Sequence, residues 1–107
     1  MRRGNLVTVA LPGAYGKLRP ALIIQSDLFS THPSFTLLPV TSELVAAPLL
    51  RITVEPNERN GLQKVSQIMV DKAHTVPRGR LGQSFGRLDE TDLLAVNRAL
   101  ALFLGFA

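Results

Sequence analysis

A basic loop runs into an apolar strand at Lys17-Leu18-Arg19-Pro20-Ala21-Leu22-Ile23-Ile24-Gln25-Ser26. Pro20 fixes its own φ and pushes the residue before it towards extended geometry, so Arg19 is held at the entrance of the strand. Residues 21–24 are apolar and favour β structure, which predicts a strand buried on both faces. A guanidinium at the mouth of a rigid buried strand is well placed to hold a phosphate.

Strand signals also lie on both sides of this stretch. Residues 6–11 are rich in β-branched side chains, and Pro12-Gly13 ends them. Downstream, apolar or alternating segments predict strands at residues 35–40, 50–54 and 64–71, and a short extended piece at residues 74–77. Turn-forming residues fill the intervals, and Asn60-Gly61 is the strongest turn pair among them.

The tail of the chain changes to a helical period. Apolar side chains recur at helical spacing from Leu93 to Leu104, Asp89 and Asp92 form a weak capping pattern, and Gly105 is placed to end the helix. Several strands closed by one C-terminal helix are typical of a small, mostly antiparallel barrel or curled sheet. We expect this mostly β architecture to form one domain over residues 1–107.

Composition restricts the class of protein. Of the 107 residues, 46% are hydrophobic and 19% are charged, which is typical of a globular chain. Cysteine is absent, which excludes disulfides and thiolate metal sites and fits a reducing cytoplasm. No apolar run approaches the roughly 20 residues that span a bilayer, and the start lacks a signal-peptide pattern. The net charge of +4 favours a polyanion or an acidic protein as partner.

Three side chains are candidates for binding a phosphate. Arg19 is suited to hold it bidentately and to stabilise the charge that develops as a bond breaks, although a surface arginine covering apolar neighbours fits as well. Thr41 and Ser42 directly follow the strand predicted at residues 35–40. Their hydroxyls are placed either to donate to phosphate oxygens or to make ordinary turn contacts with the local backbone.

A later strand carries the candidate acid. Asp71 ends the strand predicted at residues 64–71, where it would accept a proton from a ribose 2′-hydroxyl, hold Arg19, or serve only as a salt-bridging residue. Ser66 and Gln67 in the same strand would read a base edge or face solvent.

Other chemistries lack support in the sequence. His32 and His74 belong to no metal-like cluster, so we interpret both as structural or surface residues. There is no Walker loop, no dinucleotide-binding glycine pattern and no pair of metal ligands, so neither a cofactor nor a metal is expected.

In their order along the chain these motifs resemble the MazF/PemK family of toxins from bacterial toxin–antitoxin pairs. Four segments carry the resemblance: Arg3-Gly4-Asn5-Leu6-Val7, Arg19-Pro20 with the strand after it, Leu38-Pro39-Val40-Thr41-Ser42, and the stretch from Ser66 to Val76. Each motif is short, but the four occur in the family's order and at workable spacings, and the terminal amphipathic helix also fits.

The resemblance implies an SH3-like barrel with a C-terminal helix, usually a homodimer. It implies a metal-independent, sequence-specific endoribonuclease that cuts single-stranded RNA, mainly mRNA, and leaves 2′,3′-cyclic phosphate and 5′-hydroxyl ends. The family arginine carries over onto Arg19, the Thr-Ser pair onto Thr41 and Ser42, and the acidic position onto Asp71 as base or orienter. A basic groove of this kind would also bind a partly disordered acidic antitoxin.

The chain departs from the family pattern at two places. Met69 stands where some members carry an arginine, and the first loop offers Tyr15 and Lys17 where some carry a histidine. We expect Tyr15 to stack an unpaired base and Lys17 to follow the phosphates. Two alternatives stay open. One is a gyrase poison of the CcdB type, against which the absence of tryptophan counts. The other is an RNA-binding barrel without activity, which stays open because of Met69.

Overall fold

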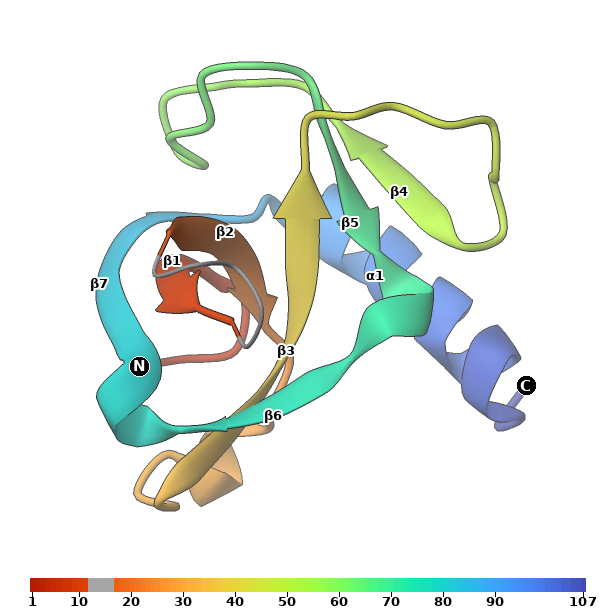
Figure 1. Cartoon of the computed structure of the whole chain (residues 1–107). Coiled ribbons are helices and arrows are strands. Elements are labelled where there is room, and N and C mark those ends of the chain that lie inside the picture. The colour runs from red at the N-terminus through yellow and green to blue at the C-terminus, as the bar shows by residue number, and fades with distance from the viewer. Residues whose placement is uncertain (12–16) are drawn as a thin grey trace.

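The structure, a computed structural model, describes residues 1–11 and 17–107. Figure 1 shows a curled sheet with one long helix packed beside it. The strands are β1 (Asn5–Ala10), β2 (Leu18–Ile23), β3 (Ser34–Thr41), β4 (Arg51–Val54), β5 (Ser66–Met69), β6 (His74–Pro77) and β7 (Leu81–Arg87). The helical elements are the short 3₁₀-helices η1 (Asp27–Phe29), η2 (Val70–Lys72) and η3 (Arg78–Arg80), and the helix α1 (Glu90–Leu104).

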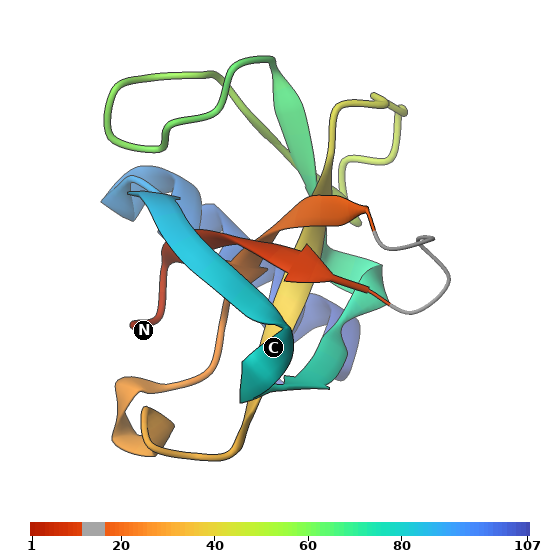
Figure 2. The same ribbon diagram turned by 60° about the vertical axis from the view of Figure 1, so that its left-hand side comes forward.

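The sheet is antiparallel in all its described pairings. Its strands follow the order β4-β5-β3-β2-β1-β7, and β6 pairs with β3 off this path. The long strand β3 therefore joins the two parts of the sheet, because its first half pairs with β6 and its end pairs with β5. The mostly β fold with a C-terminal helix is confirmed, and the expected barrel is a strongly curled sheet whose described pairings stay open (Figure 2).

Alternation along the strands divides the core between the two faces of the sheet. One face is covered by α1, and its buried cluster includes Leu6, Leu22, Leu38, Val40, Ile68, Leu93, Val96 and Leu100. The other face curls over itself, and its buried cluster comprises Val7, Val9, Ala21, Ile23, Phe35, Leu37 and Val76. Ala21, Leu22 and Ile23 are all fully buried, which confirms a strand buried on both faces at the centre of the sheet.

Two segments differ from the sequence-based expectation. The strand predicted at residues 64–71 is limited to β5, and η2 follows it directly. The strand β7 is not predicted at all, since glycines and polar residues interrupt any apolar alternation between residues 81 and 87.

The ends of α1 follow the prediction in position but not in every contact. Asp89 occupies the N-cap position without making a side-chain cap bond. Its carboxylate instead accepts a hydrogen bond from Asn57 Nδ2 at 2.9 Å and pairs with Arg59 at 3.7 Å. The helix ends at Gly105, whose φ of +86° is the left-handed conformation that glycine adopts readily.

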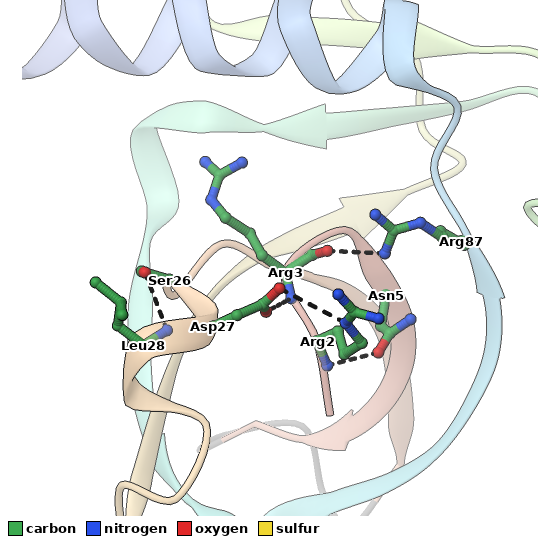
Figure 3. Close-up of polar contacts among 7 residues, drawn as sticks. All are labelled: Arg2, Arg3, Asn5, Ser26, Asp27, Leu28 and Arg87. Carbon is green, nitrogen blue, oxygen red and sulfur yellow. Dashed lines mark hydrogen bonds and ion pairs between the residues drawn. The ribbon is translucent and has the colours of Figure 1, made fainter.

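The first residues of the chain fasten β1 to its neighbours (Figure 3). The Arg3 N–H donates to Asp27 Oδ1 at 2.7 Å, and Arg3 Nη2 donates to Asn97 Oδ1 of α1 at 2.7 Å. The backbone bond from Arg3, together with the charge of Arg2, lowers the pKa of Asp27 below its usual value. Arg87 Nη1 donates to the Arg3 carbonyl at 2.9 Å. This end of β1 is thus tied to β7 and α1.

Within the described residues, no helix combines the length and the apolar character needed to cross a membrane.

Candidate functional site

A groove of about 640 Å³ opens where β2, β3 and β5 come together. Its polar walls are formed by Arg19, Thr41, Ser42, Glu43 and Ser66. Its apolar lining comprises Leu11, Pro20, Pro39, Val40 and Met69. Segments that are far apart in the sequence therefore meet at one concave surface.

The strand register explains why Arg19 and Thr41 meet. β2 pairs with β3 in antiparallel register, with Ala21 opposite Pro39. Arg19 lies two residues before Ala21 and Thr41 lies two residues after Pro39, so both stand at the end of this pairing that opens into the groove. Both side chains line the groove at this end of the two strands. The motif Arg19-Pro20 and the motif ending in Thr41-Ser42 are brought together in this way.

Arg19 presents an unengaged guanidinium to the groove. Its side chain is exposed, and it makes no hydrogen bond or ion pair with any described residue. Pro20 cannot donate a backbone hydrogen bond and restricts Arg19 to extended geometry, so the base of the side chain is fixed while its fork remains available. Such a fork matches the geometry of a phosphate.

Thr41, the last residue of β3, and Ser42 directly after it carry the two hydroxyls at this end of the groove. The backbone N–H of Glu43 donates to Thr41 Oγ1 at 3.1 Å, which is ordinary turn chemistry. The Thr41 hydroxyl still has its own proton to donate into the groove. Ser42 is exposed beside it on the groove wall.

The sequence predicts Ser66 and Gln67 together, but only Ser66 is among the described residues that line the groove. Ser66 lines the groove, with its hydroxyl donating to the Lys64 carbonyl at 2.9 Å. Gln67 is only 5% exposed and is not among the described residues that line the groove. Its Oε1 accepts from the Val45 N–H at 3.0 Å, and its Nε2 donates to the Val45 carbonyl at 3.0 Å and to Thr53 Oγ1 at 3.2 Å. Gln67 therefore holds the segment that follows the groove hydroxyls, and its amide is occupied.

Asp71 lies outside the groove. It belongs to η2, which packs against α1, and it is not among the described residues of the groove lining. Its Oδ1 is buried and has no hydrogen-bond partner in the described part of the chain. The structure thus brings Arg19, Thr41, Ser42 and Ser66 together and leaves Asp71 apart from them.

The remaining candidates are placed as follows. Lys17 is exposed, directly before β2, and Tyr15 lies outside the described residues. His32 Nδ1 accepts from the Ser34 N–H at 3.2 Å, and His74 is exposed on β6, so neither ring lines the groove. No cluster of three or more potential metal ligands occurs among the residues that the structure describes.

Sequence reasoning missed one charged residue of the groove. Glu43 is the one carboxylate among the described lining residues, and it stands beside the hydroxyls of Thr41 and Ser42. The available signal was its position directly after the Thr-Ser pair.

Comparisons with known proteins show which proteins this chain is similar to. The model of the family described as PemK-like, MazF-like toxin of type II toxin–antitoxin system matches residues 2–104. A probable endoribonuclease MazF from Mycolicibacterium smegmatis is 52% identical over 108 residues, which cover 100% of this chain and 99% of that protein.

Two solved structures share the fold. An endoribonuclease in complex with its cognate antitoxin from Mycobacterial species superposes with a TM-score of 0.85 at 20% identity, over 100% of this chain and 97% of that one. A MazE-MazF crystal structure from Deinococcus radiodurans gives a TM-score of 0.80 at 24% identity, over 98% and 96% of the two chains.

Proposed function

Because the chain belongs to the family of PemK-like and MazF-like toxins of type II toxin–antitoxin systems, we propose that it is an endoribonuclease that cuts single-stranded RNA in the groove of Arg19 and Thr41. The observation that carries the proposal is the convergence of Arg19, Thr41 and Ser42 on one groove wall. The likeness to an endoribonuclease over the whole chain supports the same activity.

The chemistry we propose uses side chains that line the groove. A ribose 2′-hydroxyl attacks its own phosphodiester, so the products are a 2′,3′-cyclic phosphate and a 5′-hydroxyl. Arg19 donates two hydrogen bonds to the phosphate oxygens and stabilises the negative charge that grows on them. Thr41 and Ser42 donate to the same phosphate and orient it. A guanidinium is a very weak acid and therefore a poor proton donor, so the role of Arg19 is electrostatic.

Asp71 keeps a place in the proposal as a positioning residue. It lies in η2, the short helix that begins directly after the groove residue Met69. From there it acts on the wall of the groove through η2 rather than by contact with the scissile phosphate.

The proposal includes protein partners. The net charge of +4 supports binding of an acidic antitoxin, as in the solved relatives that carry one. A homodimer is supported by the exposed apolar side chains near the end of α1, which are Leu102, Phe103, Leu104 and Phe106. We place the toxin in the cytoplasm, where its RNA substrate is found.

Incubation of the purified protein with a long RNA of mixed sequence tests the function. We expect discrete fragments whose ends map to one recurring sequence, with the same pattern in the presence of a chelator. Intact RNA together with arrest of DNA gyrase would instead support a CcdB-like poison. Binding of intact RNA without either effect would support a non-catalytic barrel.

Gln67→Ala is expected to lower kcat for RNA cleavage about 10- to 100-fold, because it frees the segment around Val45 and misplaces the neighbouring groove wall. The substitution should also destabilise the fold by about 1–3 kcal/mol, since the Val45 backbone groups lose their partner. Cleavage kinetics and hydrogen exchange at the Val45 amide measure the two effects.

Gln25→Ala is the matched control for this prediction. The Gln25 amide also makes three bonds that hold a loop, to the Phe29 and Ser34 carbonyls at 3.1 Å and from the Thr36 N–H at 3.0 Å. That loop lies away from the groove, so we expect a similar loss of stability and an unchanged kcat. Equal losses of activity in the two variants would contradict a specific role for Gln67.

A further inference from the structure

Glu43 is a carboxylate in the groove lining that forms no ion pair with a described residue. Its backbone N–H is bonded to Thr41 Oγ1 at 3.1 Å, which fixes the turn that carries it. The side chain is exposed and takes part in neither of the described ion pairs, which join Arg2 to Asp27 and Arg59 to Asp89. Arg19 lines the same groove from β2, yet it forms no ion pair with Glu43.

A negative charge at this place opposes the binding of a polyanion. Like charges repel, so a carboxylate beside a phosphodiester raises the free energy of the bound state. A carboxylate in an RNA-binding groove therefore weakens binding unless it performs a task that requires it. The tasks open to a carboxylate beside a ribose are to accept a proton or to accept a hydrogen bond from a base.

We propose that Glu43 is the general base of the cleavage reaction, an inference that rests on the function proposed above. A carboxylate oxygen of Glu43 takes the proton of the 2′-hydroxyl as the 2′ oxygen forms its bond to phosphorus. The bond between phosphorus and the 5′ oxygen then breaks, and the departing oxygen keeps the electron pair and takes a proton from a solvent water. The proton on Glu43 returns to the solvent and neutralises the hydroxide that remains.

Among the described residues that line the groove, Glu43 is the one suited to this role. Arg19 of β2 is a permanent cation, and the groove residues of β5, Ser66 and Met69, do not titrate near neutral pH. Asp71 lies outside the groove lining in the described structure. The backbone N–H of Glu43 also donates to Thr41 Oγ1, which keeps these two residues of the turn close together.

Glu43→Gln tests the proposal because it removes the proton acceptor and preserves the size of the side chain. We expect kcat to fall about 10²- to 10⁴-fold. KM should fall or stay the same, because the substitution also removes a negative charge that repels RNA. The wild-type rate should rise with pH through one ionisation on the acid side of the profile, and this limb should disappear in the variant. Thermal melting of the variant should match the wild type, since the side chain is exposed.

Glu58→Gln is the matched control, since it makes the same change in an exposed turn outside the groove lining. Glu58→Gln should retain both kcat and the acid limb of the pH profile. Asp71→Asn should also retain the acid limb. A Glu43→Gln enzyme with the acid limb intact would overturn the proposal, whether kcat is unchanged or only KM shifts. Loss of the limb in Asp71→Asn alone would overturn it as well. In each of these outcomes the wild type still cuts RNA, whereas failure of the proposed function would show as no cutting by the wild type.

Discussion

Arg19→Ala is expected to lower kcat for RNA cleavage by at least about 10³-fold while leaving the fold intact. The loss of a single donor to a developing oxyanion costs about 10²–10³-fold, and Arg19 supplies two donors and a full charge. Stability should not change, because the side chain is exposed and makes no hydrogen bond or ion pair with a described residue. Cleavage rates under single-turnover conditions, with thermal melting of the same samples, measure both effects.

Two further variants sharpen this prediction. Arg19→Lys keeps the charge but not the fork, so we expect it to recover only part of the activity. Arg98→Ala removes the same charge from an exposed position on α1, which is not part of the groove lining, and it should cleave at the wild-type rate. Wild-type cleavage by Arg19→Ala would remove the proposed mechanism, and equal losses in Arg19→Ala and Arg98→Ala would reduce Arg19 to a contribution of net charge.

Gly86→Ala is expected to destabilise the fold by about 3 kcal/mol or more, because the added methyl group has no space. A Cβ at this position would lie 2.1 Å from the Asn60 carbonyl oxygen and 2.4 Å from its carbon. Both are backbone atoms of a turn held by the side chain of Asn60, whose Oδ1 accepts from the Asn57 N–H at 3.0 Å and the Leu62 N–H at 3.0 Å. The turn has no easy way to move aside. Unfolding in urea measures the difference.

Gly79→Ala provides the comparison for Gly86→Ala. It is the same substitution, but nothing lies within 4 Å of a Cβ at Gly79, so the free energy of unfolding should change by less than about 0.5 kcal/mol. A loss below about 1 kcal/mol in Gly86→Ala would contradict the close contact between β7 and the turn before β5.

The same contact explains why the sequence predicts most strands but not β7. β1, β2, β3 and β4 place apolar and β-branched residues on buried faces, so their patterns are visible in the sequence. In β7, other segments of the chain come so close that two positions have no room for a side chain. A Cβ at Gly82 would lie 2.1 Å from Thr8 Oγ1, as one at Gly86 would from Asn60. Glycine is selected there by neighbours distant in sequence, and it removes the pattern that would identify a strand.

Some residues of the candidate site can also be predicted from the sequence, whereas others depend on contacts between distant segments. Arg19 and Thr41-Ser42 are predictable because each stands beside a strong strand signal, and the pairing of β2 with β3 brings these strand ends to one groove. The contact of Gln67 with Val45 is not visible in the sequence, since it depends on the path of the loop between β3 and β4. The sequence predicts Asp71 at the end of a strand, but the chain turns into η2 after Met69, and Asp71 is not among the described residues that line the groove.

The central claim is that the groove directs a ribose 2′-hydroxyl at the phosphodiester next to it. A short single-stranded RNA with one mapped cut site tests this claim when it is compared with the same strand carrying a single 2′-deoxyribose on the 5′ side of the cut. We predict a 2′,3′-cyclic phosphate and a 5′-hydroxyl from the unmodified strand and no cut at that bond in the modified one. Cleavage of the modified strand at the same bond, or fragments that begin with a 5′-phosphate, would contradict the account.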